Sequence, residues 1–149
     1  PLIEMVYGAL APFEKIRTHK NLSISVDAPE VPLRISVDGE RFGRVLRNLT
    51  ENAVSYAPPN TPVVIRIESI AEAVRVVYIN DAPGLKQNDL PFIFERFYRG
   101  EKSRSRSHGG AGIGLSIVKE LVEAHGGSVL ADLSGNRLHI GFTLPTARF

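Results

Sequence analysis

The stretch that decides the fold is His108–Gly127, which reads HGGAGIGLSIVKELVEAHGG. Glycines alternate at Gly110, Gly112 and Gly114, and apolar residues then follow at helical spacing, at positions 113, 117, 118, 121 and 122. This pattern predicts a glycine-rich loop followed by a helix that has one buried apolar stripe. A phosphate fits such an opening, because the first N–H groups of a helix lack partners and lie at the positive end of its dipole. Tight packing of the helix on a sheet is the alternative explanation of these glycines.

The composition is that of an ordinary globular domain. The 149 residues are 43% hydrophobic and 23% charged with a net charge of +2, so one domain is expected and the charge indicates no particular partner. Cysteine is absent, which excludes disulfides and thiolate metal sites, and the four histidines lack zinc-site spacing. No signal peptide and no apolar run of about twenty residues occur. The chain begins at Pro1 without an initiator Met, which we interpret as a piece of a longer protein.

The first forty residues show one helical and two alternating patterns. Helical spacing predicts a helix over Leu2–Lys20, kinked or begun late at Pro12. Strict alternation predicts short strands over Leu22–Val26 and Leu33–Val37. Asp38 is placed to cap the helix that follows.

The helix predicted over Glu40–Tyr56 has two different faces. Its core stripe comprises Phe42, Val45, Leu46, Leu49 and Ala53. Beside this stripe a polar column is formed by Arg44, Asn48 and Asn52, each four residues from the next. A solvated helix face is one explanation of the column. Cation binding is the other, because the amide oxygen of asparagine is a good neutral ligand for a hard cation such as Mg2+.

The second half of the chain contains strands and one long irregular segment. We predict strands over Pro62–Ser69, Ala73–Asn80, Ser128–Leu133 and Arg137–Leu144, the last two forming a hairpin. Residues 81–112 show little regular structure beyond a single turn around Asp89–Phe94. A loop of this length is a functional lid or a linker. Basic residues dominate its part 95–108, which fits either a solvated surface or a cationic cover for phosphates.

Three stretches follow one another along the chain: Asn48–Ala53 with Tyr56, Leu90–Arg99, and Gly110–Leu115 with His125–Gly127. They resemble the N box, the F box with the start of the ATP lid, and the second glycine box of the ATP-binding catalytic domain of sensor histidine kinases. Its superfamily includes DNA gyrase, the large heat-shock chaperone and mismatch-repair ATPases. The resemblance covers nearly the whole chain. It implies a Bergerat-type α/β two-layer sandwich, in which a mixed sheet of about five strands has three helices on one face and a long ATP lid.

The resemblance also implies a function and partners. It implies one catalytic and ATP-binding domain over 1–149, with 81–111 as the lid region and without the phosphoacceptor helical hairpin or the sensor parts. This domain would bind ATP with Mg2+ and donate the γ-phosphoryl group to a histidine on the dimerisation and phosphoacceptor domain of the same protein. His19 does not match the phosphoacceptor motif, so the chain is not expected to phosphorylate itself. A response regulator would be an indirect partner.

Location and other partners follow from the same resemblance. It implies a cytoplasmic domain of a membrane-bound bacterial sensor protein. Neither nucleic acid nor direct contact of this piece with a membrane is expected.

Individual roles follow from the resemblance residue by residue. Asn52 would hold Mg2+, while Asn48 and Arg99 would steady the phosphates. Tyr56 would pack on the base, and Asn80 with Gly84 would shape the floor of its pocket. The implied nucleotide-binding residues are Asn52, Tyr56, Asn80, Gly84, Gly110, Gly112, Ile113, Gly114 and Leu115.

The first glycine box departs from the family pattern. Where the family has Asp-x-Gly-x-Gly, this chain has Asn80-Asp81-Ala82-Pro83-Gly84. Asp81 replaces the missing aspartate only with a bulge or a slip, because neighbouring strand residues face opposite sides. Asn80 still accepts a hydrogen bond from the adenine amino group, but loses charge assistance of about 1 kcal/mol, and a flipped amide would donate instead. Ala82 costs about 1 kcal/mol if its position needs a positive φ.

Three functions fit these residues. The first is the catalytic half of a sensor kinase, with nucleotide binding weakened or altered by the first glycine box. The second is a degenerate nucleotide-binding or protein-interaction module with weakened or lost ATP binding. The third is a hydrolytic relative of the gyrase type, which the F box disfavours and which lacks its usual general base because Asn48 stands at that position.

Overall fold

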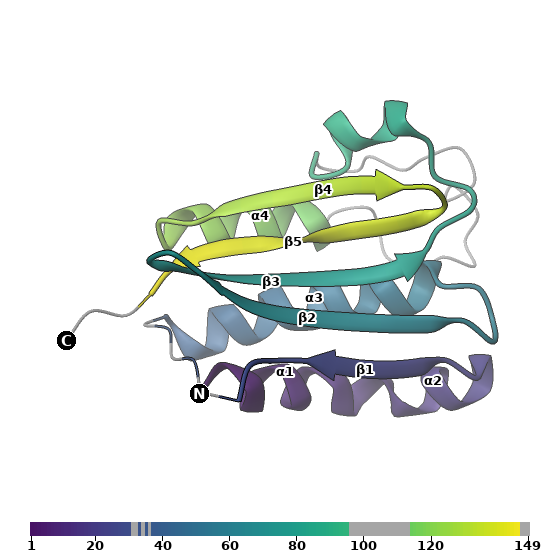
Figure 1. Cartoon of the computed structure of the whole chain (residues 1–149), viewed down its shortest axis with the longest axis horizontal. Coiled ribbons are helices and arrows are strands. Elements are labelled where there is room, and N and C mark those ends of the chain that lie inside the picture. The colour runs from purple at the N-terminus through teal and green to yellow at the C-terminus, as the bar shows by residue number, and fades with distance from the viewer. Residues whose placement is uncertain (31–32, 34, 36, 96–113, 147–149) are drawn as a thin grey trace.

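The chain folds as a two-layer α/β sandwich (Figure 1). The computed structural model describes residues 1–30, 33, 35, 37–95 and 114–146. One layer is a five-stranded sheet in the order β1-β2-β3-β5-β4, with bounds Ser23–Asp27 (β1), Pro62–Ile70 (β2), Ala73–Asp81 (β3), Ser128–Ser134 (β4) and Arg137–Pro145 (β5). β1 is parallel to β2, and the other neighbours are antiparallel. The predicted sandwich with a mixed sheet is therefore confirmed.

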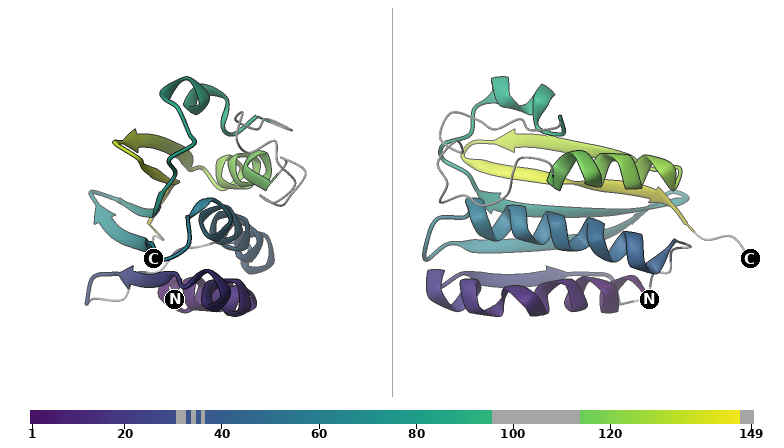
Figure 2. Two further views of the ribbon diagram at one scale, coloured as in Figure 1. Left: turned by 90° about the vertical axis from the view of Figure 1, so that its right-hand side faces the viewer. Right: turned by 180° about the vertical axis from the view of Figure 1, so that it is seen from behind.

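The helices cover one face of this sheet, as the left view of Figure 2 shows. They are α1 (Leu2–Leu10), α2 (Glu14–Lys20), α3 (Gly39–Tyr56) and α4 (Gly114–Ala124). A short 3-10 turn, η1 (Ala11–Phe13), separates α1 from α2 and contains Pro12. Proline has no N–H to donate, so the predicted interruption at Pro12 is confirmed. A second 3-10 turn, η2 (Gln87–Phe92), lies beside β4, where the Gln87 side chain donates a hydrogen bond to the carbonyl of Leu133.

The described residues of the predicted strand over Leu33–Val37 do not belong to the sheet. Leu33, Ile35 and Val37, the described apolar members of this segment, belong to no strand, although each is half-buried against the core. The Leu33 carbonyl accepts a hydrogen bond from the N–H of Leu2 at 3.2 Å. At these residues the predicted strand is wrong, because the alternation marks apolar side chains that pack on the core from a connecting segment.

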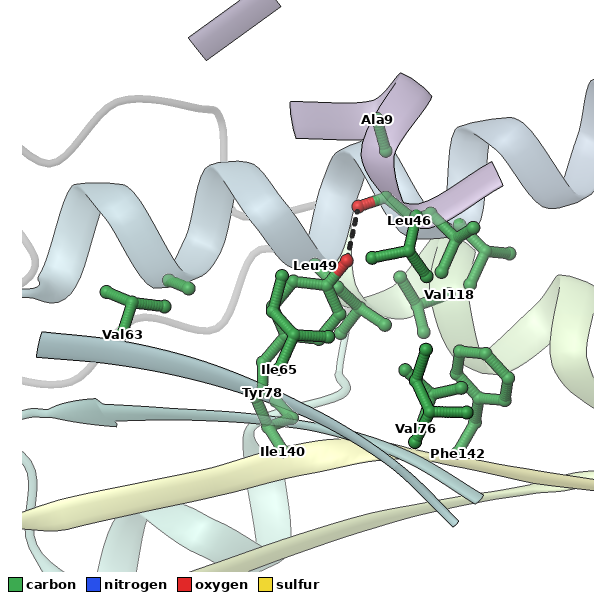
Figure 3. Close-up of a cluster of buried hydrophobic side chains, with 14 of the residues drawn as sticks. Ala9, Leu46, Leu49, Val63, Ile65, Val76, Tyr78, Val118, Ile140 and Phe142 are labelled. Carbon is green, nitrogen blue, oxygen red and sulfur yellow. Dashed lines mark hydrogen bonds between the residues drawn. The ribbon is translucent and has the colours of Figure 1, made fainter. Parts of the chain in front are cut away.

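The core lies between α3 and the sheet. The predicted stripe of α3 is completely buried: Phe42, Val45, Leu46, Leu49 and Ala53 each have 0% exposure. Figure 3 shows Leu46 and Leu49 against Ile65, Val76 and Ile140 of the sheet. Each such large side chain contributes about 1.5–3 kcal/mol on burial, so this stripe fixes which face of α3 meets the sheet.

The segment His125–Gly127 follows α4, and its first residue forms a hydrogen bond to Asp38, the residue before α3. Nε2 of His125 accepts a hydrogen bond from the N–H of Asp38 at 3.2 Å, and Nδ1 lies 2.7 Å from the Leu121 carbonyl, to which it donates. Gly126 has a φ of +80°, which favours glycine. A Cβ at Gly127 would collide with the backbone carbonyl of Thr143. This part of the second glycine box therefore has a structural task.

Candidate functional site

The polar column of α3 lies against the beginning of α4. The Asn48 Nδ2 donates a hydrogen bond to the carbonyl of Gly114, the first residue of α4, at 3.1 Å. A Cβ built on Gly114 would lie 4.0 Å from Cγ of Asn48. In Figure 1, α3 and β3 end at the same side of the sandwich, and α4 runs away from that side. The structure thus brings two of the predicted site residues into direct contact.

The side-chain amide of Asn52 is buried one turn further along α3. Neither its Oδ1 nor its Nδ2 has a hydrogen-bond partner among the residues that the structure describes. Leaving a buried polar group unpaired costs about 1–3 kcal/mol, so such a group calls for an explanation. A solvated face does not explain a buried amide. A neutral oxygen in this position fits a hard cation such as Mg2+, which prefers oxygen ligands.

Asn80 lies at the end of β3 on the side of the sheet that faces the helices. β3 pairs with β5 in unbroken register as far as Asp81, so there is no bulge in this pairing. Asn80 therefore shares a face with Tyr78 and is 0% exposed, whereas Asp81 points to the opposite face. There the Asp81 carboxylate lies 3.5 Å from Nε of Arg137. Asp81 does not take over the position of residue 80.

The amide orientation of Asn80 follows from its own hydrogen bond. Nδ2 donates to the Asp81 carbonyl at 2.9 Å, and the buried Oδ1 has no partner in the described part of the chain. A flipped amide would place two acceptor oxygens together, so the hydrogen bond decides between the two orientations. Asn80 consequently offers an acceptor, which is the group that an exocyclic amino group requires.

Ala82 is accommodated without backbone strain. The non-glycine residues with positive φ in the described ranges are Asn21, Asn60 and Ala71, and Ala82 is not among them. Its N–H donates to the Asn136 carbonyl at 2.6 Å, and its side chain is buried. Ala82 therefore does not carry the conformational cost that a positive φ would impose on a residue other than glycine.

Three of the remaining predicted residues lie in described parts of the chain. Tyr56 is the last residue of α3, and Leu115 is the second residue of α4 and packs against the core. Gly84 lies in the turn after β3. Arg99, Gly110, Gly112 and Ile113 lie outside the described residues, so their predicted roles stay predictions.

Lys20 is a residue that sequence reasoning missed. Its Nζ donates hydrogen bonds to the carbonyls of Val54 at 2.7 Å and Ser55 at 3.2 Å, in the last turn of α3. Burial lowers the pKa of Lys20. A cation is favourable at a helix C-terminus, so Lys20 anchors the end of α3 that carries Asn52 and Tyr56. No local pattern indicates this contact, because Val54 and Ser55 lie 34 and 35 residues after Lys20 in the chain.

The described residues lack two further features. No group of at least three His, Cys, Asp or Glu side chains among them is placed to hold a metal ion. None of the helices in that part of the chain is long and apolar enough to cross a membrane.

Comparisons with known proteins agree with this geometry. Residues 37–148 match the family model described as histidine kinase-, DNA gyrase B-, and HSP90-like ATPase. The sensor histidine kinase WalK of Bacillus subtilis is 38% identical over 121 residues, an alignment that covers 78% of this chain and 20% of WalK. The chain thus spans about a fifth of the length of this curated relative.

Solved structures resemble nearly the whole chain. The catalytic domain of the histidine kinase ThkA, in a nucleotide-free form, superposes with a TM-score of 0.84 at 26% identity, covering 97% of this chain and 92% of that domain. A structure of ThkA in complex with the response regulator protein TrrA gives a TM-score of 0.82 at 25% identity, covering 99% of this chain and 41% of the ThkA chain.

Proposed function

This chain belongs to the histidine kinase-, DNA gyrase B- and HSP90-like ATPase family, and from this premise we propose that it is the ATP-binding catalytic domain of a sensor histidine kinase. It binds Mg-ATP and donates the γ-phosphoryl group to a histidine on the dimerisation domain of the same protein. The domain extends over 1–149 and has 81–111 as its lid region. The parent protein is a membrane-bound bacterial sensor with this domain in the cytoplasm.

One observation carries the proposal: the buried amide oxygens of Asn52 on α3 and Asn80 on β3 have no partner among the residues that the structure describes. Buried polar groups in folded proteins are nearly always hydrogen-bonded, so a missing partner points to a ligand. Adenine supplies an amino group that donates to Oδ1 of Asn80. The phosphates of the nucleotide carry a hard cation, Mg2+, which Oδ1 of Asn52 would bind. One nucleotide thus accounts for both orphaned oxygens.

The residues of the chain position the nucleotide rather than react with it. When bound, Mg2+ supplies neutralisation of the phosphate charge. Asn48 holds the first turn of α4 against α3 through its bond to Gly114, so the N–H groups of that turn face the phosphates. Arg99 adds a cation to them, and Tyr56 packs on the base. Phosphoryl transfer needs positioning and charge stabilisation, which these groups supply.

The acceptor histidine lies outside this chain. His19, on α2, is not in a phosphoacceptor motif, so the isolated chain binds nucleotide without phosphorylating itself. The phosphoryl group passes from the dimerisation domain to a response regulator. Support for such a partner comes from ThkA, which was solved in complex with the response regulator protein TrrA.

Calorimetric titration with ADP and a non-hydrolysable ATP analogue, with and without Mg2+, tests the proposal. We expect binding that Mg2+ tightens in the wild-type chain. Asn52→Ala should lose the tightening by Mg2+, whereas Glu51→Ala, a change at an exposed position of the same helix, should keep it. Absence of nucleotide binding by the folded wild-type chain would overturn the proposal and favour the degenerate module.

A further inference from the structure

Thr50 of α3 and Tyr78 of β3 place two hydroxyl groups in the apolar core. Their exposures are 1% and 0%. Figure 3 shows Tyr78 among aliphatic side chains that include Leu46, Leu49 and Ile65. Burying a hydroxyl is costly unless it is hydrogen-bonded, and a Val and Phe pair would fill similar space without polar atoms. The hydroxyls therefore need an explanation in terms of what they bond.

The two hydroxyls connect the strand to the helix. Oγ1 of Thr50 lies 2.7 Å from the Leu46 carbonyl and 3.0 Å from the Tyr78 hydroxyl, which in turn lies 3.4 Å from the same carbonyl. Thr50 donates to the carbonyl of Leu46 and Tyr78 donates to Oγ1 of Thr50, so both O–H groups are used. Burial raises the pKa of Tyr78, which keeps its hydroxyl protonated as a donor.

This bridge joins the two elements, α3 and β3, that carry Asn52 and Asn80. Thr50 is two residues before Asn52 on α3, and Tyr78 is two residues before Asn80 on the same face of β3. Apolar contacts such as those of Leu49 fix which face of α3 meets the sheet, but they are not directional and leave small rotations of the helix less sharply defined. A hydrogen bond is directional and fixes that rotation. A rotated α3 would carry Asn52 away from its place relative to Asn80.

We propose that the Thr50–Tyr78 hydroxyl bridge is a positioning element of the nucleotide site, which holds α3 against β3 so that Asn52 and Asn80 engage the same Mg2+-nucleotide. The inference rests on the proposed function, because it assigns the bridge a task in that site. Neither hydroxyl touches the nucleotide. Both act through the asparagines beside them.

The first test compares the Kd for ADP without Mg2+ with the Kd with Mg2+, in folded protein. The Kd without Mg2+ divided by the Kd with Mg2+ should fall about fivefold in Tyr78→Phe and in Thr50→Val. Each variant loses one hydrogen bond of the bridge, which is worth about 1 kcal/mol. Thr50→Ser keeps a hydroxyl and should keep the ratio. Ile65→Val removes a methylene group from the same core and should lower stability without changing the ratio. A wild-type ratio in both bridge variants would overturn the proposal.

The second test needs no nucleotide. Side-chain amide NMR signals of Asn52 and Asn80 should shift or broaden in Tyr78→Phe, while those of Asn60, which is bonded to Asn21 at another site, should stay in place. Unchanged Asn52 and Asn80 signals would overturn the positioning role even if the variant binds ADP poorly. Failure of the wild-type chain to bind ADP would instead count against the proposed function, and the amide signals would still decide whether the bridge holds the asparagines.

Discussion

Asn80 and Asp81 are neighbours in the chain, yet their side chains lie on opposite faces of β3. Asn80 is completely buried on the side of the helices, and Asp81 forms an ion pair with Arg137 on the other side. The unbroken pairing of β3 with β5 imposes this separation. The Asp81 carboxylate is therefore on the side of the sheet opposite to the proposed nucleotide site.

Asn80→Asp should tighten ADP binding. The new carboxylate would turn its second oxygen away from the Asp81 carbonyl, to which Nδ2 donates in the wild type, and would accept the hydrogen bond of the base with charge assistance. This assistance is worth about 1 kcal/mol or roughly fivefold in Kd. Asp81→Asn is the matched control and should leave the Kd unchanged, since residue 81 faces away. Calorimetry on both variants measures the effect. Equal affinities of Asn80→Asp and the wild type would show that Oδ1 of residue 80 does not meet the base.

Gly141→Ala should destabilise the fold by about 1–3 kcal/mol or more, because overpacking forces the backbone to move. Gly141 lies opposite Val77 in the pairing of β5 with β3, and an added Cβ would collide with the Val76 carbonyl. Gly8→Ala is the control: nothing lies within 4 Å of a Cβ there, and alanine favours α1 by about 0.5–1 kcal/mol. Urea unfolding measures both. A Gly141→Ala protein as stable as the wild type would contradict the packing described here.

The Tyr78 hydroxyl should make stability depend on alkaline pH. Burial raises its pKa in the folded state above the ordinary value of 10.0, so the unfolded chain ionises first as the pH rises. The stabilising contribution is complete below about pH 10 and is lost as the pH rises further toward the folded pKa. Unfolding by urea between pH 8 and pH 11 should show the stability advantage of the wild type over Tyr78→Phe shrinking on the alkaline side. A constant difference across this range would argue against a buried, protonated hydroxyl.

Lys20→Met should loosen the C-terminal end of α3. The variant keeps the aliphatic stem but loses the hydrogen bonds to the carbonyls of Val54 and Ser55. A cation at a helix C-terminus is worth about 0.3–1 kcal/mol. Amide exchange should therefore accelerate in the last turn of α3, around Ala57, whose N–H donates to the Ala53 carbonyl. Lys15→Met, at an exposed position of α2, should have no such effect.

Much of the fold could be predicted from local pattern. The stripe from Phe42 to Ala53 predicted both α3 and its buried face, because helical spacing is a property of neighbouring residues. Asp38 was predicted as the cap, and its side chain accepts a hydrogen bond from the N–H of Arg41 at 3.1 Å. The predicted strand over Leu33–Val37 is wrong at its described residues, since alternation shows which side chains are apolar but not whether the backbone has a strand to pair with.

The candidate site was predictable only as a set of residue types. The motifs placed Asn48, Asn52 and Asn80 together through the family resemblance, and the helical column alone did not exclude a solvated face. The burial of the Asn52 amide, the orientation of the Asn80 amide and the absence of a positive φ at Ala82 became visible in the fold. None of the three is a property of a short segment.

The sequence by itself determined the helices, most of the strands, the family and the chemical groups available at the site, because periodicity, capping and motif spacing are local. The tertiary structure alone decided which polar groups have partners. Asn48 meets Gly114, Lys20 meets Val54, and Thr50 meets Tyr78 across separations of 66, 34 and 28 residues, whereas the oxygens of Asn52 and Asn80 meet no partner in the described residues. Hydrogen bonds of side chains depend on contacts between distant segments, and only the packed sandwich creates those contacts.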